Sequence, residues 1–143
     1  MKLRSDWSLD RMNARARGRL PELFGLEVIS MAQGELAMRM KIQPQFLAPN
    51  GYLHAASVIA VADTSCGYAC FAHLPDGAEN FTTIELKSNF LGTAREGTLE
   101  SKVNAAHLGR TTQVWDSTVR ELDSGRTIAL FRCTQLILWP RAK

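Results

Sequence analysis

The sequence predicts an α+β domain in which one long buried helix is wrapped by a curved antiparallel β-sheet. Residues 54–71 are rich in alanine, contain no proline and place apolar side chains on nearly every face, as a buried helix does. Two strand-like segments precede this helix and four follow it. The last of them, residues 126–139, has about fourteen residues, and such a long strand indicates a sheet that curves.

The N-terminal part is expected to be helical. Ser5 or Ser8 can cap a helix that continues to about Gly18, with Trp7, Leu9 and Met12 on its apolar side. A turn region is predicted after it, because Pro21 and Gly25 both favour turns.

Two strands are predicted before the central helix and four after it. Residues 27–31 form a short strand, and residues 36–42 alternate apolar and polar side chains, as a half-buried strand does. Residues 43–52 contain two prolines, an asparagine and a glycine, and are expected to form a loop. The later strands are expected at 82–90, 98–106, 111–122 and 126–139, with turns at 92–97, 108–110 and 123–125.

The composition indicates one domain over residues 1–143, with residues 1–20 as an N-terminal helical segment. The chain has 45% hydrophobic and 22% charged residues, which is ordinary for a globular domain of this length. Residues 1–20 carry many arginines and no apolar signal segment, and the weakly polar segment 55–72 is interrupted by Asp63. We therefore expect a cytoplasmic protein that does not interact with a membrane.

The cysteines and the charge restrict the possible ligands. Cys66, Cys70 and Cys133 have neither disulfide nor zinc-site spacing, and we interpret them as packing residues in a reducing compartment. A net charge of +3 suits a phosphorylated ligand, although a basic N-terminal segment without any function gives the same charge. The basic residues are not interleaved with aromatics, so we expect no nucleic-acid partner.

Asp63 is the unusual residue of the buried helix. Burying a carboxylate costs several kcal/mol unless it is paired, and residues 54–71 contain no lysine or arginine. One interpretation is a structural aspartate satisfied by Thr64 or by a distant arginine. The other is a carboxylate held in a partly dry cleft, where it acts as a base or a nucleophile.

The start of the same helix is suited to binding an oxyanion. The first backbone N–H groups of a helix are unpaired and carry the positive end of its dipole, and Ala55 and Ala56 are small enough for a carbonyl to approach. Ala55 and Asp63 are separated by roughly 12 Å along a helix, so one carbonyl cannot contact both. Two antiparallel copies of the helix can bring them together. A sheet also covers only part of an all-apolar helix, so both arguments predict a dimer.

Four motifs occur in a characteristic order: Asn50 to Ala56, Asp63 nine residues after His54, Thr82 to Leu91, and His107 to Thr111. In this order they resemble the hotdog acyl-CoA thioesterase superfamily, and most closely its phenylacetic-acid-degradation branch. The resemblance covers nearly the whole chain beyond the first twenty residues. It implies a hotdog fold, dimers that often pair into tetramers, and hydrolysis of an acyl-CoA thioester to acid and CoA without a metal or cofactor.

The resemblance also implies roles for individual residues. Asp63 would be the nucleophile or the general base, and the Ala55 N–H would polarise the thioester carbonyl from the partner subunit. His54 and Asn50 would orient the substrate or the attacking water. Arg110, together with Lys87 or Arg95, would contact the CoA phosphates. The full set of implied substrate-binding residues is Thr64, Lys87, Asn89, Arg95, Arg110 and Thr111.

Two positions depart from the family pattern. The Gly-Gly of the family is Ala55-Ala56 here, which keeps the N–H groups but narrows the approach to them. Some relatives carry a hydroxyl four residues after the acid, where this chain has Gly67, so that Thr64 or Ser65 takes over its role or no residue does.

Two other functions remain open from the sequence. The departures at the Ala55-Ala56 pair and at Gly67 suit a non-catalytic acyl-CoA-binding module. A hotdog hydratase or dehydratase would pair a catalytic histidine with an acid, for which His54 and Asp63 are the candidates. The acyl group is also open, because the family branch implies an aromatic acyl group whereas a medium-chain group fits equally well.

Overall fold

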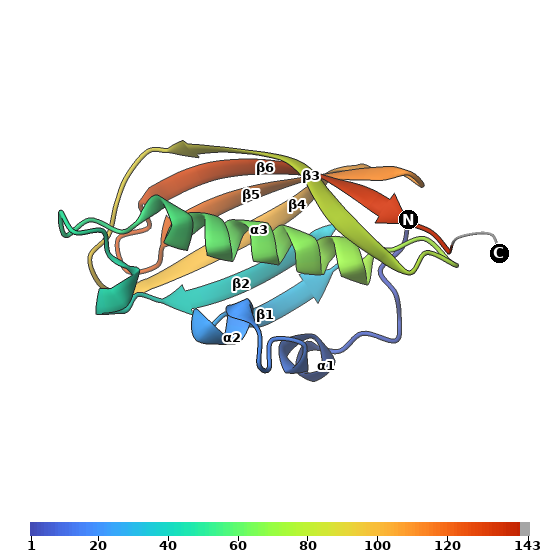
Figure 1. Cartoon of the computed structure of the whole chain (residues 1–143), viewed down its shortest axis with the longest axis horizontal. Coiled ribbons are helices and arrows are strands. Elements are labelled where there is room, and N and C mark those ends of the chain that lie inside the picture. The colour runs from blue at the N-terminus through green and yellow to red at the C-terminus, as the bar shows by residue number, and fades with distance from the viewer. Residues whose placement is uncertain (141–143) are drawn as a thin grey trace.

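The computed structural model describes residues 1–140, so residues 141–143 of the predicted domain lie outside the described part. One long helix, α3 (Ala55–Ala72), lies across one face of a six-stranded antiparallel sheet that curves around it (Figure 1). This arrangement confirms the predicted fold class. The strands are β1 (Glu27–Ala32), β2 (Glu35–Lys41), β3 (Asn80–Phe90), β4 (Thr98–Leu108), β5 (Thr112–Glu121) and β6 (Thr127–Leu138), in the spatial order β1-β2-β4-β5-β6-β3.

The N-terminal segment differs from its prediction. Helix α1 (Leu9–Ala14) is capped by Ser8, whose Oγ accepts the Arg11 N–H at 3.2 Å, but it ends well before Gly18. Gly18 has a φ of 66°, which a right-handed helix does not accommodate. The expected turn at Pro21 is also wrong: Pro21 lies in the first turn of α2 (Leu20–Leu23), where its missing N–H costs no hydrogen bond.

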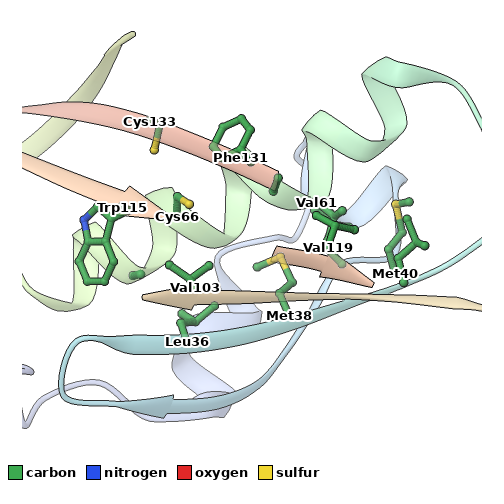
Figure 2. Packing of buried hydrophobic residues seen from close by; sticks show 14 of the residues in the cluster. Leu36, Met38, Met40, Val61, Cys66, Val103, Trp115, Val119, Phe131 and Cys133 are labelled. Atoms are coloured by element: carbon green, nitrogen blue, oxygen red, sulfur yellow. The ribbon is translucent and has the colours of Figure 1, made fainter. Parts of the chain in front are cut away.

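The core lies between α3 and the concave face of the sheet. Figure 2 shows side chains from β2, β5 and β6 converging on those of the helix, with Trp115 fully buried beside Cys66 and Cys133. All three cysteines are free and buried, which confirms them as packing residues. By length and composition α3 could span a membrane, but 56% of it is buried inside this domain, as in the core helix of a globular protein.

His73, at the end of α3, ties the helix to the β1–β2 turn. Its Nδ1–H donates to the Ala69 carbonyl at 2.8 Å, and its Nε2 accepts the Gly34 N–H at 2.9 Å. These two bonds require a neutral ring, and burial lowers the pKa of His73. His73 is therefore a structural residue of the core.

The sheet covers only part of α3, as predicted. Ala55 and Ala56 are exposed, and Ile59, Asp63 and Tyr68 are only half-buried. These residues recur at helical spacing, so they form one stripe along the helix that no strand of this chain covers.

The strand expected at residues 82–90 is present as β3, but its side chains do not alternate regularly between the two faces of the sheet. Its pairing with β6 shifts between Thr83 and Glu85, which indicates a β-bulge. Before the bulge Thr83 pairs with the buried Gln135, and after it Leu86 pairs with the buried Cys133. Thr83 rather than Thr82 therefore shares the helix-facing side with Leu86.

Candidate active site

Asp63 lies halfway along α3, on the helix stripe that the sheet leaves partly open. Its Oδ1 is buried and has no hydrogen-bond partner. Burial raises the pKa of Asp63, and the side chain of Thr83 opposes this rise to a smaller extent. No arginine or lysine of the described chain bonds to this carboxylate, so the interpretation as a structural, arginine-paired aspartate has no support in residues 1–140.

The first turn of α3 leaves one backbone donor unused. His54 caps the helix, and its Nδ1 accepts the Ala56 N–H at 3.0 Å. The Ser57 and Val58 N–H groups donate to the His54 carbonyl. The Ala55 N–H donates to no acceptor within the described chain, and Ala55 is exposed. A free N–H at the positive end of an eighteen-residue helix can stabilise a developing oxyanion.

The loop before α3 is held in place by local hydrogen bonds. The Asn50 side chain accepts the Tyr52 N–H at 3.2 Å, so Asn50 supports the turn that leads into the helix. The Leu53 N–H donates to the Thr93 hydroxyl at 3.2 Å, which links this loop to the β3–β4 connection. Arg95, in that connection, lies over the Tyr52 ring at 5.3 Å from its centroid. Arg95 and Ala55 therefore lie at the same end of α3.

The other predicted phosphate contacts lie elsewhere in the chain. Arg110 and Thr111 follow β4, whereas Arg95 precedes it, and an eleven-residue strand separates the two positions by roughly 35 Å. Arg110 lies over Trp139, with its guanidinium carbon 4.8 Å from the ring centroid. Within one subunit, Arg95 and Arg110 therefore cannot bind the same end of a ligand.

Lys87 and Asn89 lie on the outer face of the sheet, away from α3. They line a surface cavity of about 420 Å³ with Leu130 and the ion pair of Asp116 and Arg132, whose Oδ2 and Nη2 atoms are 2.7 Å apart. Lys87 pairs with the exposed Arg132 across the two strands, not with a buried residue. The structure thus brings neither Lys87 nor Asn89 together with Asp63 in one subunit.

Two polar residues of the neighbouring strands β3 and β6 were not identified from the sequence. Thr83 on β3 donates its hydroxyl hydrogen to Gln135 Oε1 on β6 at 3.0 Å, and Gln135 is fully buried. Gln135 interrupts an otherwise apolar alternation of inward residues on β6, formed by Ala129, Phe131, Cys133 and Ile137. This interruption was a usable signal in the sequence. No such signal exists for Thr83, because the bulge between Thr83 and Glu85 determines the face of β3 on which its side chain lies.

Thr64 is half-buried next to Asp63 on α3, within reach of the same open stripe. Within residues 1–140, no group of three histidine, cysteine, aspartate or glutamate side chains is arranged to hold a metal ion. The two groups available for chemistry are the Asp63 carboxylate, whose pKa is raised by burial, and the free Ala55 N–H, which can donate to an oxyanion.

Residues 50–132 match the family model of the thioesterase superfamily. This match includes the helix start, Asp63, β3 and the β4–β5 turn, and it covers more than half of the chain.

Individual relatives agree with the family match. The acyl-coenzyme A thioesterase PaaI of Escherichia coli is 29% identical over 110 residues, which are 76% of this chain and 75% of the relative. The 1,4-dihydroxy-2-naphthoyl-CoA hydrolase of Listeria monocytogenes is 25% identical over 116 residues, which are 80% and 92% of the two chains. A crystal structure of a Pseudomonas aeruginosa thioesterase superposes with a TM-score of 0.89 at 25% identity, covering 95% of this chain and 97% of that one. The chain belongs to the thioesterase superfamily of thioester hydrolases and has the hotdog fold that its sequence motifs predicted.

Proposed function

We propose that this thioester hydrolase cleaves an acyl-CoA to the free acid and CoA, at a site that two subunits build together. Asp63 of one subunit acts as nucleophile or general base, and the Ala55 N–H of the partner subunit polarises the thioester carbonyl. Two of its relatives are named for acting on CoA thioesters, which supports this substrate class.

The unpaired Ala55 N–H, on the same helix as Asp63, is the observation that carries the proposal. The two groups are eight residues apart, which corresponds to roughly 12 Å along α3. Since a carbonyl carbon and its oxygen are much closer to each other than that, one helix cannot supply both groups to one thioester. Two antiparallel copies of α3 supply them to two equivalent sites, as a twofold dimer requires.

Strand β3 supports such a dimer. It is an edge strand of eleven residues, and long edge strands of monomeric proteins are usually protected by charge or by a covering segment. Strand β3 carries the charged residues Glu85 and Lys87, but it also exposes three large apolar side chains, Ile84, Leu86 and Phe90, of which Ile84 is 54% exposed. We propose that two copies pair along this edge and thereby cover the open stripe of α3.

In the proposed reaction, attack on the thioester carbonyl places negative charge on its oxygen. The free Ala55 N–H and the helix dipole stabilise that charge. Asp63 either takes a proton from the attacking water or attacks the carbonyl itself to form an anhydride that water then hydrolyses. In both cases the C–S bond breaks and CoA leaves as a thiolate, which takes up a proton.

The remaining roles follow from position. Arg95 lies at the same end of α3 as Ala55, so we propose it as a contact for the CoA phosphates. His54 has its Nδ1 occupied by the cap, which leaves Nε2 to orient substrate or water, whereas Asn50 acts through the turn it supports. Thr64 would contact substrate beside Asp63. Lys87, Asn89, Arg110 and Thr111 would have to serve a site through another copy of the chain.

CoA release from a panel of aromatic and medium-chain acyl-CoAs tests this proposal, with wild type compared with Asp63→Asn. We expect Asp63→Asn to reduce kcat by about 10²-fold or more. Asp10→Asn, at an exposed aspartate of α1, is the control and should retain full activity. Unchanged turnover in Asp63→Asn removes Asp63 from the chemistry. Saturable binding without turnover in wild type supports a binding module, and hydration of an enoyl-CoA supports a hydratase.

We also propose that the protein works in the cytoplasm. The three buried cysteines are free thiols, which suits a reducing compartment.

A further inference from the structure

Arg15 places a positive charge beside the C-terminal end of α3. It follows the last residue of α1, and its guanidinium carbon lies 3.8 Å from the centroid of the Phe71 ring and 5.4 Å from that of Trp7. Figure 1 shows α1 near this end of α3, and the Arg4 N–H donates to the Ala72 carbonyl at 2.9 Å. Contacts within the chain therefore hold the N-terminal segment against the end of α3.

The charge of Arg15 is not neutralised within the described chain. Asp6 forms ion pairs with both Arg4 and Arg11, at 3.1 and 3.2 Å. Within residues 1–140, no carboxylate lies at ion-pair distance from Arg15, which is exposed. An aromatic ring attracts a guanidinium without competing for its five N–H donors. The Phe71 ring thus orients Arg15 and leaves these donors available to an anion.

A row of contacts links Arg15 to the helix turn that follows Asp63. The Phe71 ring meets the Phe81 ring edge-on, with centroids 6.4 Å apart, and Phe81 packs directly against Gly67. Asp63, Gly67 and Phe71 are spaced four residues apart and therefore follow one another along one side of α3. Phe71 lies eight residues beyond Asp63, which corresponds to roughly 12 Å along the helix.

This separation matches the length of the flexible arm of CoA. A pantetheine arm joins the thioester sulfur to the diphosphate, and its covalent path is about as long as four residues of backbone, or roughly 14 Å when extended. A thioester held at Asp63 can therefore place its diphosphate level with Phe71. Phosphate oxygens are the acceptors that a guanidinium binds best, with two parallel hydrogen bonds.

The proposed dimer brings a second arginine to the same end of the site. Within one subunit, Arg95 contacts Tyr52 just ahead of the α3 start, whereas Arg15 lies at the opposite end of the helix. When two copies of α3 run antiparallel, Asp63 of one copy is level with Ala55 of the partner subunit. Arg15 and Arg95 of the partner subunit then lie on the same side of the shared thioester.

On the basis of the proposed function, we propose that Arg15 binds the diphosphate of the acyl-CoA held at Asp63 of its own subunit, together with Arg95 of the partner subunit. The N-terminal segment then belongs to the substrate site and does more than add positive charge. Arg15 contacts no reacting atom, so its loss should weaken binding of the ground state and of the transition state equally.

The experiment measures kcat and KM for wild type, Arg15→Met and Arg17→Met with three thioesters of one acyl group. Acyl-CoA carries the diphosphate and the 3′-phosphate, acyl-dephospho-CoA carries only the diphosphate, and acyl-pantetheine carries neither. We expect Arg15→Met to raise KM roughly 10-fold for the first two substrates with little change in kcat. With acyl-pantetheine, its kcat/KM should equal that of wild type.

Arg17→Met is the matched control, because Arg17 is an exposed arginine of the same segment without an aromatic or acidic partner in the described chain. It should behave as wild type with all three substrates. Arg15→Lys retains the charge but not the paired donors, so it should recover part of the lost affinity. Thermal melts identify variants that do not fold, and Arg15→Gln serves the same test if Arg15→Met is one of them.

A purely structural role for Arg15 predicts a different result. Loss of its packing on Phe71 would change the activity towards all three thioesters by the same factor, and that outcome overturns the proposal. An effect seen with acyl-CoA but absent with acyl-dephospho-CoA overturns the assignment to the diphosphate.

Calorimetric titration with CoA itself separates this proposal from the proposed function. If wild type cleaves acyl-CoA and Arg15→Met binds CoA as tightly as wild type does, the role of Arg15 fails while the proposed function stands. If wild type binds CoA without cleaving any acyl-CoA, the proposed function fails, and a roughly 10-fold weaker Kd in Arg15→Met still supports the phosphate contact.

Discussion

His54 closes the first turn of α3 by accepting the Ala56 N–H on its Nδ1 at 3.0 Å. This bond places the ring hydrogen of a neutral His54 on Nε2. It also satisfies the Ala56 N–H, which would otherwise be a second free backbone donor in this turn. Because Ser57 and Val58 donate to the His54 carbonyl, the Ala55 N–H alone remains free among the first four residues of the helix.

Ala55→Pro should abolish the oxyanion contact without disturbing the fold. Proline is well tolerated as the first residue of a helix, and His54 already has the extended backbone, φ −67° and ψ 136°, that suits a residue before proline. We expect kcat to fall by about 10²- to 10³-fold with little change in the melting temperature. The measurement is CoA release together with thermal unfolding followed by circular dichroism.

The matched control for this change is Ala55→Gly, which keeps the N–H and restores the residue typical of the family. It should retain wild-type activity or exceed it, because the methyl group no longer narrows the approach. A fully active Ala55→Pro enzyme would exclude the Ala55 N–H from catalysis.

Mixing two inactive variants should restore activity if the site spans two subunits. In a dimer of Asp63→Asn with Ala55→Pro, one site combines both defects and the other contains neither. Random pairing makes half of the dimers mixed, so activity should recover to about a quarter of the wild-type value. The variants are co-expressed with different tags, and CoA release is measured on the doubly purified fraction and on the mixture. Absence of any recovery in the mixed dimers indicates that Asp63 and Ala55 act within one subunit.

The sequence predicted Asp63 and the buried helix because both depend on local pattern: an acid without a cation among apolar helix residues is visible in one dimension. The presence of six strands and the curvature of the sheet were predicted from the number and length of the strand segments, whereas their spatial order required the structure. Which side chains of β3 face the helix could not be predicted. The bulge between Thr83 and Glu85 changes the face on which successive side chains lie, and a bulge depends on how β3 pairs with β6. The hydrogen bond between Thr83 and Gln135 was missed because the bulge determines which face of β3 carries Thr83.

Separating the candidate phosphate contacts also required the three-dimensional structure. In the sequence, Lys87, Arg95 and Arg110 are equivalent cations close to family motifs. The sheet places Lys87 on its outer face and puts β4 between Arg95 and Arg110, so the distance between them depends on strand direction and not on sequence separation.

Ionisation of Asp63 should make the protein less stable at neutral pH than it would be with a neutral side chain. The pKa is 3.8 in the unfolded chain and is raised in the folded state by burial. The folded state therefore binds the proton more tightly, and stability is lost as the pH rises from 3.8 through the folded pKa. Asp63→Asn lacks this loss, so its melting temperature should exceed that of wild type at pH 8, and the difference should shrink towards pH 3.5. Calorimetry across this range measures the difference, and a difference that does not change with pH would show that Asp63 titrates normally.

Gly67 and Phe81 together should determine what can occupy the position one turn after Asp63. A Cβ atom at Gly67 would lie 3.0 Å from Phe81 Cζ and 3.4 Å from Cε2, and the ring is held by an edge-on contact with Phe71 at 6.4 Å between centroids. Replacing a helical glycine with alanine normally raises the free energy of unfolding by about 1 kcal/mol, whereas overpacking lowers it by about 1–3 kcal/mol. Gly67→Ala should therefore lower the free energy of unfolding in the wild type, as measured by urea titration.

The same substitution should have the opposite sign once the ring is removed. In a Phe81→Leu background, Gly67→Ala should raise the free energy of unfolding by about 1 kcal/mol, because only the helix propensity remains. Gly67→Ser in that background would place a hydroxyl where some relatives carry one, and CoA release would show whether it assists Asp63. If Gly67→Ala has equal effects with and without the phenyl ring, the ring moves aside freely, and Phe81 is not the reason that this chain has a glycine one turn after Asp63.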